Sequence, residues 1–164
     1  MRIRAIEPPD HESCRHLYTE LVQHHRDIYD QQGIGGTDPG AGFDEYLARS
    51  DRVETWVAVD GDTIVGMCGL LWQDGDAEIE PVVVTENRRG AGIARRLIET
   101  AIQESRRRGA TDVNIRPVAR NVSAIRAFHE LGFRTVGHVQ LFMRLSDSEV
   151  EWADLDLHDR RFGH

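Results

Sequence analysis

The sequence predicts a mixed α/β (α+β) domain, with a mostly antiparallel, roughly six- to seven-stranded sheet, a central parallel strand pair and about four flanking helices. Two strand-like runs, Thr55–Val59 and Thr63–Trp72, are joined by Asp60-Gly61, which is typical of a tight antiparallel hairpin. A β-branched run over Ile79–Val84 is followed by a glycine-rich turn and an amphipathic helix. Another strand-like run, Asp112–Arg116, follows that helix, so these two strands should pair in parallel through a right-handed crossover.

The chain begins with a short strand and a long helix. Arg2–Ile6 alternates polar and apolar residues, as expected for a strand, and two prolines end it. Asp10 can cap the helix that follows, whose apolar stripe runs from Cys14 to His25. The histidines of this helix do not make a zinc motif, because H-E-x-x-H would need a histidine where Arg15 stands. We therefore expect no metal site.

A glycine-rich segment separates the first helix from the hairpin. Residues 31–42 contain five glycines, which predicts a mobile loop. The apolar spacing over Phe43–Leu47 indicates a short second helix. Gly66 and Gly69 interrupt the second hairpin strand, which indicates a β-bulge or a close approach of another backbone.

The second half of the chain predicts two helices and a closing hairpin. The first helix covers Gly92–Arg108 and the second covers Ser123–Leu131, with Gly132 as a natural residue for its C-terminal cap. Strands at Phe133–Val136 and Val139–Arg144 should then form a hairpin.

Composition limits the class of protein. The chain has 164 residues, which suits one domain, and a net charge of −8, which argues against nucleic acid or an anionic membrane as a partner. No run is long enough to span a membrane, and the N-terminus has no apolar signal core. Two cysteines, Cys14 and Cys68, are expected to be buried free thiols. We therefore predict a cytoplasmic protein.

The turn after Ile79–Val84 predicts an anion site. Gly90, Ala91 and Gly92 leave the backbone without bulky side chains directly before the helix. The first N–H groups of a helix have no partner inside it, and the helix dipole makes the potential there positive. A diphosphate could therefore approach this backbone closely.

Three kinds of phosphate site begin with a glycine-rich turn of this sort. A P-loop needs a lysine, and this chain has none. A dinucleotide fingerprint needs a small residue where Arg95 stands. The third reading takes Arg89–Ala94 as R-x-x-G-x-A, which resembles the acetyl-CoA signature of the Gcn5-related N-acetyltransferases (GNAT). Asn121–Phe133 looks like the second signature of that family, N-x-x-A-x-x-x-Y-x-x-x-G-F, with Phe128 at the tyrosine position.

The resemblance covers residues 1–145, which would be the GNAT domain, and it implies a GNAT-like fold that binds acetyl-CoA as co-substrate. It implies an N-acetyltransferase acting on a primary amine of a small molecule or peptide, by direct attack in a ternary complex. A non-catalytic acyl-CoA-binding or sensing domain is the alternative. The residues implied to bind the cofactor are Val82, Val83, Val84, Arg89, Gly90, Ala91, Gly92, Ile93, Ala94, Asn121, Ser123 and Phe128.

The base is expected on the central strand. Glu78 and Glu80 are two residues apart, so they share one face of it. Two carboxylates within reach of each other can raise one pKa toward neutrality, which suits a general base. Glu80 is preferred and Glu78 comes second, although both can equally be solvent-facing strand residues. At Phe128, the resemblance implies that the usual tyrosine acid is missing.

The acidic segment 146–164 is expected to be a frayed tail or to dock on a partner subunit. We expect a homodimer, because the exposed late strands offer an edge and Trp152 offers an apolar anchor.

Overall fold

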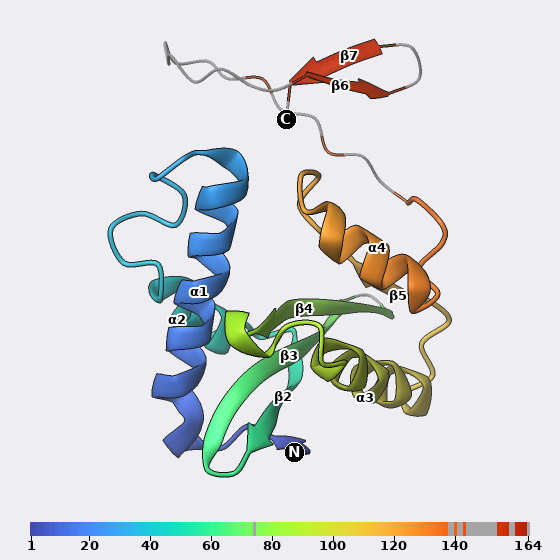
Figure 1. Ribbon diagram of the computed structural model, residues 1–164. Helices are drawn as coiled ribbons and strands as arrows, with labels where there is room; N and C mark the ends of the chain where they lie inside the picture. Colours follow the sequence, from blue (N-terminus) through green and yellow to red (C-terminus); the bar gives the residue numbers. More distant parts are fainter. Residues whose placement is uncertain (74, 138–139, 141–142, 144–153, 158–159, 164) are drawn as a thin grey trace. The chain divides into compact units, whose positions relative to one another are not determined.

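The computed structural model describes residues 1–73, 75–137, 140, 143, 154–157 and 160–163 of the chain. They fall into two compact parts, Met1–Pro117 and Val118–His164. Within these residues, the first part contains a five-stranded sheet, and the second contains one helix and a two-stranded sheet (Figure 1).

The five-stranded sheet follows the order of the sequence. Each of the first three strands pairs antiparallel with the next, and the fourth pairs in parallel with the fifth, from Ala77 opposite Val113 to Ile79 opposite Ile115. The described sheet therefore has five strands instead of six or seven, and its parallel pair lies at one edge instead of the centre. The strands are β1 (Arg2–Ala5), β2 (Arg52–Asp60), β3 (Thr63–Gln73), β4 (Asp76–Val84) and β5 (Val113–Ile115).

Helices cover both faces of this sheet (Figure 1). On one face lie α1 (His11–Tyr29) and α2 (Ala41–Leu47), and on the other lies α3 (Ile93–Arg107). Side chains alternate between faces along β3: Met67 packs toward α1, while a Cβ at Gly66 would lie 3.3 Å from Leu97 of α3. The cluster beneath α1 and α2 is apolar and buried, and consists of Cys14, Leu17, Phe43, Tyr46, Val57, Val59, Met67, Leu71 and Val83.

The entry into α1 differs in detail from the expectation. Asp10 occupies the N-cap position of α1, but its carboxylate makes no cap hydrogen bond to that helix. It instead accepts from the Glu7 N–H at 2.8 Å and from the Arg4 guanidinium at 2.5 and 2.9 Å. The hydrogen bond from Arg4 is the main reason why the pKa of Asp10 lies below its usual value. Asp10 therefore joins β1 to the short turn η1 (Pro8–Asp10).

Three elements of the first part approach one another closely at Gly69. The β3–β4 register shifts between Cys68 and Leu70, so Gly69 lies in a bulge, as the sequence predicted. A Cβ at Gly69 would lie 2.1 Å from the Tyr46 hydroxyl oxygen and 2.3 Å from the Glu80 carbonyl oxygen. That Tyr46 hydroxyl shares a hydrogen bond of 2.7 Å with Thr55 Oγ1. Only glycine leaves room for α2, β3 and β4 to meet here.

The second part contains α4 (Val122–Glu130) and an antiparallel pair of strands, β6 (Asp154–Leu157) and β7 (Arg160–Gly163). After α4, Gly132 takes a positive φ of 107°. The Gly132 N–H donates to His129 O at 3.1 Å, and the Phe133 N–H donates to Phe128 O at 3.1 Å. These two bonds form a Schellman motif, and the Phe128 and Phe133 rings, with centroids 6.3 Å apart, make the apolar contact that often accompanies it.

The predicted strand at Phe133–Val136 is wrong. These residues have no regular structure, and the Val136 side chain is 83% exposed. An alternating pattern favours a strand only where a neighbouring strand can accept the ladder bonds, and within the described residues none pairs with this segment. Of Val139–Arg144, only 140 and 143 are described, and neither is in a strand.

The described residues of the acidic tail are not frayed, because β6 and β7 pair there in antiparallel register. Trp152, on which the predicted homodimer contact depends, lies outside the described residues.

Cys14 and Cys68 are buried and free, as predicted, and burial raises the pKa of the Cys14 thiol to about 12. Among the described residues, no helix combines the length and hydropathy that crossing a bilayer requires.

We predict that Gly69→Ala destabilises the protein by about 1–3 kcal/mol, because the added methyl group would force Tyr46 and the Glu80 backbone apart. Urea unfolding measures the difference. Gly33→Ala is the matched control, since a Cβ at Gly33 would meet nothing within 4 Å. Equal unfolding midpoints for the two variants would contradict the close approach.

Candidate functional site

The turn between β4 and α3 exposes backbone N–H groups. The chain leaves β4, forms the short turn η2 (Glu86–Arg88), and takes positive φ values at Gly90 (77°) and Gly92 (74°) before α3 begins. Within the described part of the chain, no acceptor is bonded to the N–H groups of Gly90, Ala91, Gly92, Ile93 and Ala94. A Cβ at either glycine would meet nothing within 4 Å, so the space beside this backbone is open. This arrangement fits an anion, and in particular a diphosphate.

Arg89 differs from its neighbours in this turn. Its N–H already donates to Glu86 O at 3.2 Å, so it is not among the unpartnered groups. Its guanidinium Nε donates to Val84 O at 3.1 Å and ties the turn back to the end of β4. Arg88 is ion-paired with Asp60 at 2.7 Å. Arg89 therefore brings a positive charge to the turn without a described carboxylate partner.

Glu20 of α1 holds the start of the same turn. One carboxylate oxygen accepts from Thr85 Oγ1 at 3.0 Å, and the other accepts from the Glu86 N–H at 3.2 Å. The two bonds satisfy donors at the beginning of η2 and fix the turn to a helix on the opposite side of β4 from α3. Glu20 could not be identified from the sequence, because no local pattern relates it to residues so far along the chain.

One edge of β4 is paired along only part of its length. β3 pairs with β4 from Asp76 to Val84 on one side, whereas the ladder with β5 on the other side ends at Ile79. Within the described residues, no strand pairs with Val82–Val84 on the β5 side. The side chains of Val83 and Val84 are buried in the core, so any role for them in binding would come from their backbone.

The two glutamates of β4 have different surroundings. Glu78, with a side chain 16% exposed, is bonded through both carboxylate oxygens to the Arg116 guanidinium, one of these bonds measuring 2.5 Å. This contact raises the pKa of Arg116. Glu80, 50% exposed, has one longer ion pair, with Arg49 at 3.8 Å. Each carboxylate is therefore paired with an arginine, and Glu80 is the more accessible of the two.

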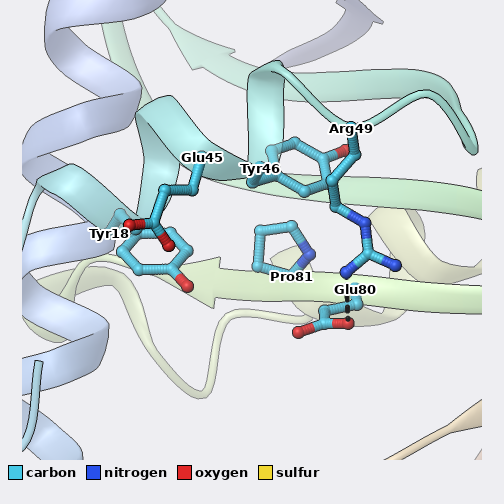
Figure 2. A pocket seen from close by; sticks show the side chains of 7 residues that line it. Tyr18, Glu45, Tyr46, Arg49, Glu80 and Pro81 are labelled. Carbon is cyan, nitrogen blue, oxygen red and sulfur yellow. Dashed lines mark ion pairs between the residues drawn. The ribbon is translucent and has the colours of Figure 1, made fainter.

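A pocket of about 280 Å³ lies beside Glu80 (Figure 2). Tyr18 from α1 and Glu45 from α2 lie on one side of it, and Arg49 and Glu80 lie on the other. Pro81 of β4 lies between the two pairs. The sequence does not single out Tyr18, Glu45 and Arg49, since a tyrosine in an apolar stripe and two charges near a short helix are typical of ordinary surface helices.

The hydroxyl of Tyr18 stays protonated in this pocket. Its pKa is raised, first by burial and then by the charges of Glu80 and Glu45. The Tyr18 ring packs against the Gly42 backbone, where a Cβ would lie 2.5 Å from Tyr18 Cε1. Gly42 therefore lets α1 and α2 approach closely enough to form one wall of the pocket.

The remaining predicted residues lie in the second part and have local roles. Asn121 is the N-cap of α4, where its Oδ1 accepts from the Ala124 N–H at 3.1 Å and from Ser123 Oγ at 2.9 Å. Phe128 contacts Phe133, as described above. Among the described residues, no group of three or more His, Cys, Asp or Glu side chains could hold a metal ion.

Comparisons with known proteins agree on one family. The model of the acetyltransferase (GNAT) family matches residues 12–133. The chain is 29% identical to rat N-acetyltransferase 8B over 119 residues, which are 69% of this chain and 48% of that protein. The chain thus spans about half the length of that curated relative.

Solved structures share the fold. An aminoglycoside N-acetyltransferase, AAC(6')-Iy, in complex with CoA is 18% identical, with a TM-score of 0.66, and the match covers 88% of this chain and 95% of that one. An acetyltransferase of the GNAT family from Staphylococcus aureus is 18% identical, with a TM-score of 0.69, over 89% of this chain and 94% of the other. Identities this low establish a common fold only.

We predict that Ala91→Glu weakens the binding of coenzyme A at least about tenfold, because a carboxylate beside the unpartnered N–H groups would repel a diphosphate. Calorimetric titration measures the affinity. Ala91 is exposed and has no positive φ, so this change does not strain the backbone as a side chain at Gly92 would. Gln103→Glu, on the exposed side of α3, adds the same charge far from the turn and should leave the affinity unchanged. Equal affinities for the two variants would refute the anion site.

Proposed function

The chain belongs to the acetyltransferase (GNAT) family, and we propose that it is an acetyl-CoA-dependent N-acetyltransferase that acts on a primary amine. The observation that carries the proposal is the row of N–H groups from Gly90 to Ala94, which have no described acceptor and open onto free space. A helix start with this exposure suits the diphosphate of a coenzyme. Glu80, with an adjoining pocket, lies on the strand that leads into the same turn.

Acetyl-CoA would supply a thioester, whose acetyl carbon bonds to the amine nitrogen as the carbon–sulfur bond breaks. The N–H groups of Gly90–Ala94 and the Arg89 guanidinium would hold the diphosphate. The backbone of Val82–Val84, on the edge that β5 leaves open, would bond the amides of the pantetheine arm. Asn121, Ser123 and Phe128 are proposed on the resemblance alone, beside the arm.

Glu80 is the proposed base, with Glu78 second. An ammonium must lose a proton before its nitrogen can attack, and a carboxylate at the wall of a pocket can accept it, directly or through water. Glu80 meets this requirement better than Glu78, because its single contact with Arg49 is long and its side chain is half exposed. Glu78 is engaged through both oxygens by Arg116.

The alternative is a non-catalytic acyl-CoA-binding domain. Phe128 favours it, because a phenylalanine cannot protonate a departing thiolate. Release of free thiol from acetyl-CoA, measured across a panel of amines, separates the two functions. Thiol release that depends on the amine supports the enzyme, and coenzyme binding without turnover supports the alternative.

We predict that Glu80→Gln lowers turnover roughly a hundredfold or more near neutral pH, because glutamine keeps the size of the side chain but cannot take the proton. The loss should shrink at high pH, where more of the amine is already neutral. A pH–rate profile of the thiol release measures both effects.

Glu78→Gln is the matched control for that experiment and should cost less turnover than Glu80→Gln. If neither substitution changes the rate, the base is another residue or a chain of waters. If Glu78→Gln costs more, Glu78 takes the role.

We predict that Phe128→Tyr leaves turnover unchanged or raises it modestly. A CoA-like thiol has a pKa of about 8.5, so its thiolate can leave without an acid from the protein. The packing against Phe133 should keep the ring in place in the variant. Matching unfolding curves for the native chain and Phe128→Tyr would verify this. A native chain that is inactive with every amine, and is switched on by Phe128→Tyr, would contradict the enzymatic function.

A further inference from the structure

The pocket beside Glu80 has features that select among amines. Its volume of about 280 Å³ is at the lower limit of ligand sites, which favours a small molecule. One wall is the Tyr18 ring, packed on Gly42, and Pro81 lies between the two walls. These surfaces can bury a short methylene chain but not a large ring system.

Carboxylates face this pocket from two sides (Figure 2). Glu80 projects from β4, and Glu45 projects from α2 on the side of Tyr18. Within the described part of the chain, Glu45 makes no ion pair or hydrogen bond, so its charge is available to a ligand. Burial, and after it the charges of Glu80 and Glu45, raise the pKa of Tyr18 in the same pocket.

The one described guanidinium in the pocket is already engaged. Arg49 Nε and Nη2 donate to the two oxygens of Asp51 at 2.9 and 2.7 Å, and Nη1 lies 3.8 Å from Glu80. A ligand carboxylate that bound Arg49 in a bidentate way would compete with Asp51 for the Nε and Nη2 donors. Asp51 and Glu80 both contact Arg49, and Glu45 has no described partner, so the pocket favours positive charge over negative charge.

Resting on the function proposed above, we propose that the acceptor is a small diamine, whose reacting amine meets Glu80 and whose second ammonium binds Glu45. The methylene chain between the amines lies along Tyr18 and Pro81. Glu45 is then a residue that determines specificity, because it contacts the end of the acceptor that does not react.

Three ligands of equal chain length test this assignment: 1,4-diaminobutane, butylamine and 4-aminobutanoate. With the native protein, kcat/KM for the diamine should exceed that for butylamine at least about tenfold, since a charge-assisted hydrogen bond contributes that much. The aminobutanoate should be poorer than butylamine, because its carboxylate faces Glu45.

Variants of Glu45 test the residue itself. Glu45→Gln should reduce the advantage of the diamine over butylamine, measured with the same variant, to about threefold or less. Glu45→Lys should reverse the order of the diamine and the aminobutanoate. Glu12→Gln removes one exposed carboxylate of α1 outside the pocket, and should keep the preference of the native protein. The KM for acetyl-CoA should be the same in all these proteins.

Equal kcat/KM values for the three ligands, or a preference that survives Glu45→Gln, would overturn the diamine assignment while leaving the acetyltransferase function intact. If no amine is acetylated, the proposed function fails. Calorimetry with 1,4-diaminobutane then tests separately whether the pocket binds a diamine. Diamine binding that Glu45→Gln weakens at least about tenfold would support the cation site. Absence of diamine binding would overturn it.

Discussion

The close approach at Gly69 is the constraint on which the candidate site depends. A side chain there would collide with the Tyr46 hydroxyl and the Glu80 carbonyl, so α2 can pack on the sheet only because this residue has no Cβ. The bulge at Gly69 shifts the register between β3 and β4 opposite Glu80 and Pro81. The same packing brings α2, with Glu45, beside the half-exposed carboxylate of Glu80.

The strand β4 then serves three adjacent features. Its first residues pair with β5, its middle carries Glu80 and Pro81 at the pocket, and its end leads into the turn with unpartnered N–H groups. Glu20 fixes that turn to α1, the same helix that contributes Tyr18 to the pocket. A single helix thus contacts both the proposed acceptor pocket and the proposed diphosphate site, which suits a reaction between two bound molecules.

Much of the fold could be predicted, because its elements follow from local patterns. The strand at Ile79–Val84, the helix from Gly92 and the helix from Ser123 all appear within a few residues of the expected bounds. The strand predicted at Phe133–Val136 is not observed, because an alternating run becomes a strand only when another strand accepts its hydrogen bonds. The described strands of the tail lie instead at β6 and β7, in a segment whose acidic composition suggested a frayed end.

The sequence by itself determined the exposed turn between β4 and α3, since positive φ at Gly90 and Gly92 and the apolar face of the helix depend on residues close in the chain. Only the tertiary structure decided what surrounds each carboxylate. Glu78 meets Arg116, which is 38 residues away, and Glu20 meets Thr85 across 65 residues. Such pairs are set by how helices and strands pack, and no periodicity records them. That is why the strand pattern only puts Glu78 and Glu80 on one face, whereas in the structure one is bound through both oxygens and the other faces a pocket.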